Sequence, residues 1–416
     1  MDPGVPPNRF YPEQNYEHGE SAIAKAVAAG TLTPRDVDLI KEYIHEREAE
    51  VHLSIARVIK VMYALISWRR FLRVELPLLT LPDIYDGITR IKTGISSRGT
   101  PYKQNTLHDQ IRILKQFLLW AVENEYLTLP EKKIRAIKTP PVNCFTTEPD
   151  EILSYDEIVA LIRGCRSSRD RAIIATLYES GCRIGELGRL RWRDIVFDDY
   201  GVKMYIDDRK TRKRRYVRLA LAREYLAAYR NDYSGDPSGD AIVFITKLGT
   251  PMEYQAYKRA LITAATRGGV TKKVKPHLFR KSRITHMISQ NYQESVIKRA
   301  MWGNLDTKMM KTYLVQSESD IDAEFLDKAG IRSKADTTRP LGPVPCPRCH
   351  TVNGPTSAAC SHCGLPLTEG AALELDEAVD RIEESQLYRH AVEKALEILR
   401  SEMALARSAD VSERPT

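Results

Sequence analysis

Gly181-Cys-Arg183-Ile-Gly-Glu186-Leu187 is the stretch of this 416-residue chain that says most about its fold. It is followed along the chain by His277-Leu-Phe-Arg280 and then by Tyr313. Taken singly, none of these residues is informative, because a lone arginine is usually a surface residue and a tyrosine on a helix usually belongs to the core. Two arginines, a histidine and a tyrosine in this order are a stronger signal, since one reaction needs all of them.

That reaction is the cleavage of a phosphodiester without a metal ion. Its transition state spreads negative charge over the equatorial phosphate oxygens, and two guanidinium groups can clamp those oxygens in a bidentate manner. A nucleophile must attack in line, and a proton must reach the leaving 5′ oxygen. Arg183 and Arg280 could form the clamp, Tyr313 could attack, and Lys210 could supply the proton.

The two arginine motifs resemble the conserved boxes of the tyrosine recombinases, the phage integrase family. Residues 180–195 are similar to the first box almost throughout, and residues 276–282 resemble the second. The resemblance covers about residues 33–330 and implies that the protein cuts and rejoins DNA through a 3′-phosphotyrosine bond. It implies that Arg183 and Arg280 are the two phosphate clamps and that Tyr313 is the nucleophile. It also implies that Glu186 supports the site and that His277 transfers a proton or contacts the phosphate.

A basic run between two predicted strands is similar to the β-hairpin of the family, whose lysine is the general acid. The run extends from Asp208 to Leu219 and contains several lysines and arginines. Counting back from the strand at 215–219 places the acid at Lys210. Lys213 is the alternative, because a turn can shift the register by a few residues.

One position departs from the family pattern. The family places a histidine or tryptophan nine residues before the nucleophile, whereas this chain has Asn304 there. An asparagine can hydrogen-bond a phosphate oxygen, but it cannot donate or accept a proton as histidine does. The alternative to an active recombinase is therefore a catalytically weakened DNA-binding protein of the same fold, and a topoisomerase-like enzyme is a third possibility.

Hydrophobic spacing and turn residues predict a mainly α (α+β) fold with several parts. The catalytic part should contain a small antiparallel sheet, and the helical part before it resembles the DNA-gripping core-binding domain of the family. The expected boundaries are a disordered lead at 1–32, a helical core-binding domain at 33–140, a catalytic domain at 150–330, a zinc ribbon at 340–368 and a C-terminal amphipathic helix at 372–407.

Four of the seven cysteines form two pairs with the spacing of a metal site. Cys346 and Cys349 make one CxxC pair, and Cys360 and Cys363 make the other. Paired knuckles of this kind present four thiolates to a tetrahedral Zn²⁺. Four sulfur ligands complete the coordination shell, so the expected metal is structural.

The C-terminal segment carries apolar residues at heptad-like 4,3 spacing in two blocks. One block contains Leu375, Val379 and Ile382, and the other runs from Val392 to Met403. The blocks are out of phase around residues 385–389. Such a helix either packs on its own protein or associates with a second copy.

The composition of the chain restricts the partners and the cellular compartment that we expect for the protein. The formal net charge of +8 and the pI near 9.0 favour a polyanionic partner, which is double-stranded DNA in this context. No signal peptide and no long apolar segment is evident, so we expect a cytoplasmic protein without membrane contact. No GxxxxGK[ST] loop is present, and none is needed, since the phosphotyrosine keeps the bond energy without a nucleotide cofactor. The resemblance implies a homo-tetramer on synapsed DNA.

Overall fold

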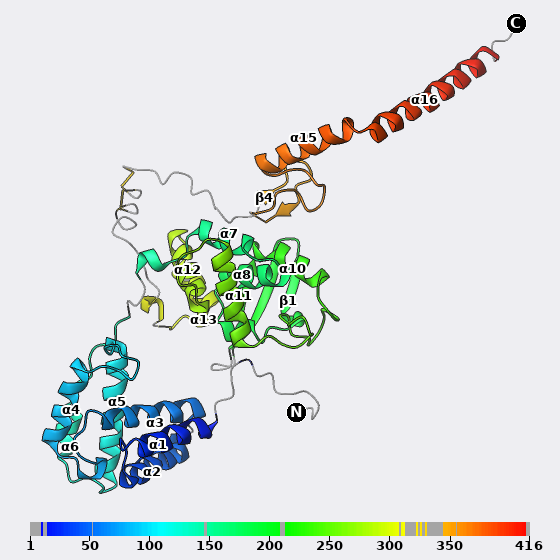
Figure 1. Cartoon of the computed structure of the whole chain (residues 1–416). Helices are drawn as coiled ribbons and strands as arrows, with labels where there is room; N and C mark the ends of the chain where they lie inside the picture. The colour runs from blue at the N-terminus through cyan, green and yellow to red at the C-terminus, as the bar shows by residue number, and fades with distance from the viewer. Residues whose placement is uncertain are drawn as a thin grey trace. The chain divides into compact units, whose positions relative to one another are not determined.

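The computed structural model describes most of the chain, and its residues form two compact units. The described residues are 10, 15–51, 53–144, 148–208, 213–307, 309–312, 322, 325–326, 329–330, 344–354 and 356–412. The division falls between Glu148 and Pro149 (Figure 1).

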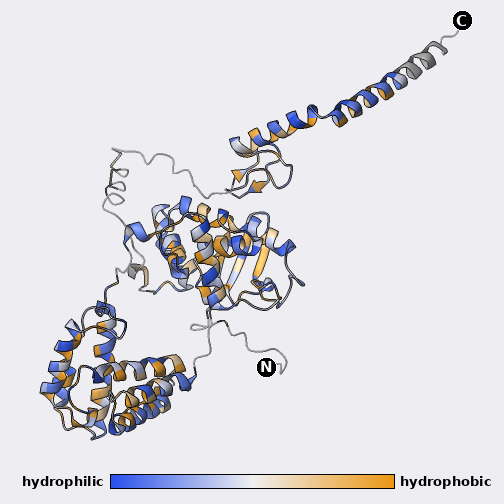
Figure 2. Ribbon diagram, viewed as in Figure 1, coloured by the Kyte–Doolittle hydropathy of each residue, from blue (hydrophilic) through white to orange (hydrophobic). Residues whose placement is uncertain are grey.

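All the named elements of the first unit, among its described residues, are helices. Its core is one cluster of buried side chains, with Trp68 and Phe117 among the largest. The helices show apolar and polar faces along their length (Figure 2). The elements are α1 (Tyr16–Ala28), α2 (Pro34–Val51), α3 (Ile55–Arg69), η1 (Leu76–Leu78), α4 (Leu81–Thr93), α5 (Gln104–Glu123) and α6 (Glu131–Arg135).

The spacing of apolar residues explains why α5 packs as it does. Ile111, Leu114, Phe117, Leu118 and Ala121 are all buried, at intervals of three and four residues. This period places them on one face of the helix. The apolar spacing of this segment therefore accounts for both the helix and the face that it buries.

The expected disordered lead at 1–32 is wrong for part of its length, because residues Tyr16–Ala28 form α1. Ile23 and Ala26 are buried in the core of the unit. Gly19 lies against Met62 of α3, where a larger residue would leave no room for the methionine sulfur. The polar start of the chain carries no sign of this face, because Ile23 and Ala26 are buried only against the other helices of the unit.

The second unit contains the helices that position the candidate site. A capping box opens α7, with Ser154 accepting from the backbone N–H of Glu157, and the Ser-x-x-Glu spacing is typical of this cap. The elements are η2 (Pro149–Glu151), α7 (Tyr155–Arg163), α8 (Ser168–Ser180), α9 (Ile184–Leu187), η3 (Trp192–Asp194), α10 (Ala222–Asn231), α11 (Tyr254–Arg267), α12 (Pro276–Ser289), α13 (Glu294–Trp302) and η4 (Met309–Thr312).

A three-stranded antiparallel sheet completes this unit, so the expected α+β class is confirmed. The strands β1 (Ile195–Asp198), β2 (Gly201–Asp208) and β3 (Lys213–Leu219) lie in the order β1-β2-β3. Asp208 pairs with Lys213 at the end of the β2–β3 ladder. The residues between them, 209–212, lie outside the described part of the chain.

Further along the chain are a small two-stranded sheet and two helices. The strands are β4 (Val344–Pro345) and β5 (Val352–Asn353), and the helices are α15 (Glu369–Glu383) and α16 (Gln386–Ser412). The single helix expected at 372–407 is therefore two helices. The break has a local cause, because Ser385 accepts a hydrogen bond from the backbone N–H of Tyr388 at 3.2 Å and so caps α16.

Among the described residues, we find no helix with the length and apolarity needed to span a lipid bilayer.

Candidate active site and metal site

Arg183 is placed by the turn between α8 and α9. Gly181 ends α8 with φ +56°, a left-handed conformation that favours glycine. Arg183 then occupies the position directly before α9, and Glu186 lies in the first turn of that helix. The side chain of Arg183 is 46% exposed, so its guanidinium can reach a ligand.

Glu186 is the carboxylate that organises the arginines. It accepts hydrogen bonds from the backbone N–H of Arg183 at 2.7 Å and from the Arg183 guanidinium at 2.9 Å. It also accepts from Arg215 at 2.9 Å and 3.4 Å. Burial raises the pKa of Glu186, but the hydrogen bond and charge of Arg215, helped by Arg183, outweigh burial and lower it. Glu186 is therefore ionised at neutral pH and holds both guanidiniums.

Arg215 is a site residue that the sequence analysis did not single out. Its side chain is 4% exposed, and its Nε donates to the carbonyl oxygen of Ala300 at 2.9 Å. The signal was present in β3, where the inward positions alternate and Val217 and Leu219 occupy the next two. Counting back by two places Arg215 on the buried face.

Arg280 lies on α12 and is fully buried. Its Nη1 donates to the carbonyl oxygen of Gly181 at 2.7 Å, and its Nη2 donates to that of Met301 at 2.8 Å. The guanidinium also lies over the ring of Trp302, 5.0 Å from its centroid. Arg280 thus joins the segment before Arg183 to the end of α13. Its role as the second phosphate clamp stays a prediction.

His277 is the second residue of α12 and lies close to these arginines. The residue as a whole is exposed, yet its ring is buried enough to lower its pKa, and the charges of Arg280, Lys281 and Arg183 lower it further. The imidazole is therefore neutral at pH 7 in the protein without DNA. A neutral ring can donate one hydrogen bond and accept another.

Asn304 lies just after α13, in a turn that its own side chain closes. Its Oδ1 accepts from the backbone N–H of Asp306 at 3.1 Å. The two remaining site residues expected from the sequence, Lys210 and Tyr313, lie outside the described residues. The side chain of Lys213, the alternative acid, is likewise outside them. Tyr313 directly follows η4, which ends at Thr312.

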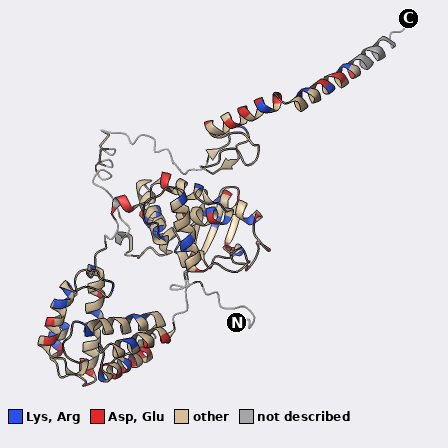
Figure 3. Cartoon of the chain, viewed as in Figure 1, with Lys and Arg blue, Asp and Glu red and all other residues tan. Residues whose placement is uncertain are grey.

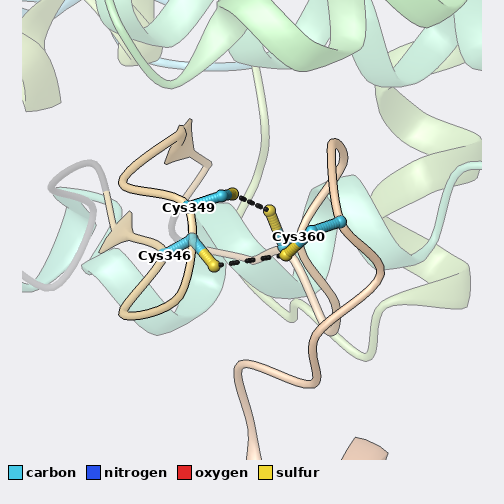
Figure 4. A group of neighbouring side chains, drawn as sticks. Cys346, Cys349 and Cys360 are labelled. Carbon is cyan, nitrogen blue, oxygen red and sulfur yellow. Dashed lines mark hydrogen bonds between the residues drawn. The ribbon is translucent and has the colours of Figure 1, made fainter.

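The four expected metal-ligating cysteines lie together. Their sulfur atoms are all within 4.8 Å of one another. Each cysteine of the first CxxC pair lies close to one of the second. The Sγ atoms of Cys346 and Cys363 are 3.6 Å apart, and those of Cys349 and Cys360 are 3.5 Å apart (Figure 4). Four sulfurs about 2.3 Å from a tetrahedral metal would be about 3.8 Å apart, so the spacing fits a metal ion.

The local backbone holds the two cysteine pairs in matching turns. The residue after the second cysteine of each pair has positive φ, which is +58° at His350 and +71° at Gly364. Asn353, buried between the pairs, donates to the carbonyl oxygen of Thr351 at 2.8 Å and accepts from the N–H of Ser361 at 2.9 Å. The sequence analysis did not identify Asn353, because a single asparagine in a loop carries no distinctive spacing.

Comparison with known proteins gives the same family as the motifs. The phage integrase family matches residues 151–319. The tyrosine recombinase XerC of Xanthomonas axonopodis pv. citri is 28% identical over 192 residues, which are 45% of this chain and 59% of that protein. Transposase A from transposon Tn554 of Staphylococcus aureus is 25% identical over 185 residues, or 42% of this chain and 51% of that protein. The chain thus spans little more than half the length of these curated relatives.

Solved structures share the fold at low identity. A lambda integrase dimer bound to a COC′ core site superposes with a TM-score of 0.52 and 15% identity, over 66% of this chain and 76% of that one. The Tn1549 transposon integrase in complex with a circular intermediate DNA gives 0.52 and 17% identity, over 69% and 98%. Residues 151–319 of this chain thus match the phage integrase family, and the solved structures share its fold.

Proposed function

We propose that this protein is a site-specific recombinase that cleaves and rejoins DNA strands through a 3′-phosphotyrosine intermediate. The observation that carries the proposal is the arrangement around Glu186. One buried carboxylate holds the partly exposed Arg183, while Arg280 ties the backbone before Arg183 to the segment that leads to position 313. Residues from three distant stretches of sequence are therefore fixed around one arginine that can reach a phosphate.

In the proposed reaction, the hydroxyl of Tyr313 loses its proton to solvent and its oxygen attacks the scissile phosphorus. The new bond joins phosphorus to the tyrosine oxygen, and the bond to the 5′ oxygen breaks. The leaving 5′ oxygen takes a proton from Lys210, or from Lys213 if the hairpin register differs. The 5′ hydroxyl of a partner strand then gives a proton back to that lysine and attacks the phosphotyrosine. The bond between phosphorus and the tyrosine oxygen breaks, and the tyrosine takes up a proton from solvent.

The charged groups would stabilise this reaction by electrostatics. Arg183 would bind the non-bridging oxygens, with Arg280 as the second clamp once its geometry adapts to bound DNA. A nearby phosphate favours the protonated form of a histidine, so DNA should raise the pKa of His277 from its lowered value. His277 would then donate a hydrogen bond to the phosphate.

Double-stranded DNA is the proposed substrate, bound by the catalytic domain and by the helical domain at 33–140. The active assembly would be a homo-tetramer on synapsed DNA. Phosphate contacts should dominate affinity, so binding should weaken steeply with salt. A DNA substrate also agrees with the cytoplasmic location expected from the sequence.

The cysteine cluster at 346–363 is proposed to be a structural zinc site. Its four thiolates match the ligand set and spacing of a closed tetrahedral centre, which leaves no position for a substrate. The bound ion would stabilise the ribbon by joining its two turns, and no step of the DNA reaction involves it.

A suicide DNA substrate tests the enzymatic proposal. The substrate is nicked near the cleavage site and is taken from the repeats that flank the encoding element. Wild-type protein should form a covalent adduct that survives denaturation, whereas Tyr313→Phe should bind the same DNA without forming one. Lys210→Ala and Lys213→Ala identify the acid, because a substrate with a 5′-thio leaving group should rescue only the variant that has lost it.

Two outcomes would favour the other functions. Specific binding to the flanking repeats without any adduct would support the catalytically weakened DNA-binding protein. Relaxation of a supercoiled plasmid that lacks the repeats would support a topoisomerase-like enzyme.

A further inference from the structure

The two C-terminal helices carry apolar side chains that the described part of the chain does not cover. No residue of α15 is buried. In α16, Leu396 is 46% exposed and Leu399 is 54% exposed. Four large aliphatic residues of α15 are exposed as well, namely Leu373, Leu375, Val379 and Ile382. An exposed apolar stripe of this length normally marks a binding surface.

The spacing in α16 is that of a helix that pairs with another helix. Val392, Leu396, Leu399 and Met403 follow one another at intervals of four, three and four residues. Such intervals place apolar residues at the a and d positions of a heptad. The helix has 27 residues and is about 40 Å long, enough for more than three heptads. Its stripe is therefore suited to a second helix of similar length.

The charges of α15 and α16 indicate which kind of partner binds the stripe. The segment Glu369–Glu383 that forms α15 contains six acidic residues and one basic residue, so it would be repelled by DNA (Figure 3). Helix α16 contains four acidic and four basic residues, counted without histidine. A balanced helix with an apolar stripe is complementary to itself. We propose that α16 pairs with α16 of a second copy of this chain.

The flanking charges indicate an antiparallel pair. If Leu396 faces Leu399 of the second copy, the pairing extends over nearly the whole helix. Glu393 and Arg400 lie on the same flank of the stripe, seven residues apart, so the antiparallel pair sets Glu393 of each copy beside Arg400 of the other. A parallel pair would instead bring the two acidic α15 helices side by side, where like charges repel.

Self-association through one short stripe suits a protein that assembles on DNA. Four apolar layers and two flanking ion pairs give a modest affinity, which rises sharply once two copies are held near each other. DNA that binds several protomers would hold them close together, and only this effect of DNA rests on the proposed function. The pairing itself requires no DNA.

Analytical ultracentrifugation of the full chain without DNA tests the proposal. We expect a reversible monomer–dimer equilibrium over concentrations up to about 100 µM. Leu396→Asp combined with Leu399→Asp should weaken the dimer by at least about tenfold. The matched control changes Leu387 and Ile398 to Asp, since both are exposed apolar residues on the opposite side of α16. The control should dimerise like the wild type.

A charge exchange separates pairing from general damage to the helix. Glu393→Arg alone and Arg400→Glu alone should each weaken the dimer, and the double variant should restore it. A monomeric wild type throughout the range, or equal loss in the apolar variant and its control, would overturn the proposal. Failure of the double variant to recover would overturn the antiparallel arrangement. None of these results depends on the covalent adduct, so this proposal and the proposed function can fail separately.

Discussion

Removing the carboxylate of Glu186 should destabilise the catalytic unit more than any surface substitution. The side chains of Glu186 and Arg215 are 6% and 4% exposed, so Glu186→Ala leaves an unpaired guanidinium in the interior. Breaking a buried pair in this way costs about 3–5 kcal/mol of unfolding free energy. Glu186→Gln keeps the shape and one acceptor, and should cost about 1.5–3 kcal/mol.

Hydrogen exchange followed by mass spectrometry measures this loss in each unit separately. For the slowest amides of β3, 3–5 kcal/mol corresponds to exchange about two to three and a half orders of magnitude faster. Peptides from the helical unit at 16–135 should be unchanged and serve as an internal control. Glu157→Gln is the matched variant, because the Glu157 carboxylate also accepts from the backbone N–H before a helix, that of Ser154, and also pairs with a basic residue, Lys272, but is partly exposed. It should cost about 1 kcal/mol or less.

A double-mutant cycle completes the test. Glu186→Ala with Arg215→Ala should cost clearly less than the sum of the two single changes, because the second change removes the stranded charge. Additive losses, or wild-type exchange in the β3 peptides of Glu186→Ala, would refute the view that this pair holds the site together.

Three further predictions concern a buried histidine, a glycine at a helix end and the cysteine cluster. His286 is buried against Tyr178, and burial followed by the charge of Arg283 lowers its pKa to about 4. The folded state favours the neutral imidazole, whereas in the unfolded chain the pKa is 6.5. The free energy of unfolding is therefore highest above pH 6.5 and falls as the pH drops toward 4. About 2 kcal/mol should be lost by pH 5, in urea unfolding of the wild type compared with His286→Phe. Gly181→Ala should be more destabilising than Gly269→Ala in thermal unfolding, since both glycines have positive φ but only at 181 would a Cβ meet a neighbouring sulfur, at 2.8 Å. Stripping the four-cysteine site with a strong chelator should release one zinc ion per chain, measured with a colorimetric indicator, and should speed hydrogen exchange in the ribbon alone. A zinc content near zero in purified protein, with the ribbon already protected, would contradict the metal assignment.

The sequence predicted best what depends on neighbours along the chain. The box around Arg183 and Glu186 is a local pattern, because a first-turn carboxylate reaches back to the residue that opens the helix. The phase shift near Ser385 marks the place where α15 ends and α16 begins, although the sequence analysis kept one helix there. The buried position of Arg215 could have been predicted from the alternation of inward and outward side chains along β3.

What the sequence could not predict depends on segments that only the fold brings together. The burial of Arg280 requires two backbone carbonyl groups, one at the end of α8 and one at the end of α13. No spacing rule connects Gly181 to Met301. The early helix α1 was missed for a similar reason, since Ile23 and Ala26 become a core face only when α3 is beside them.

Asn304 determines how much of the chemistry of the family can be carried over to this chain. Its side-chain oxygen closes the turn to Asp306, as short polar side chains often do. The residue therefore helps to fix the backbone between α13 and the segment that leads to Tyr313. In-line attack depends on that path, because a small displacement of a nucleophile is costly. The proposed proton for the 5′ oxygen comes from the hairpin lysine and not from position 304. Asparagine in place of histidine thus removes a proton donor and acceptor but keeps a group that can hydrogen-bond a phosphate oxygen. The sequence retains the proposed nucleophile and acid, which is why we favour an active recombinase over a DNA-binding protein that has lost its chemistry.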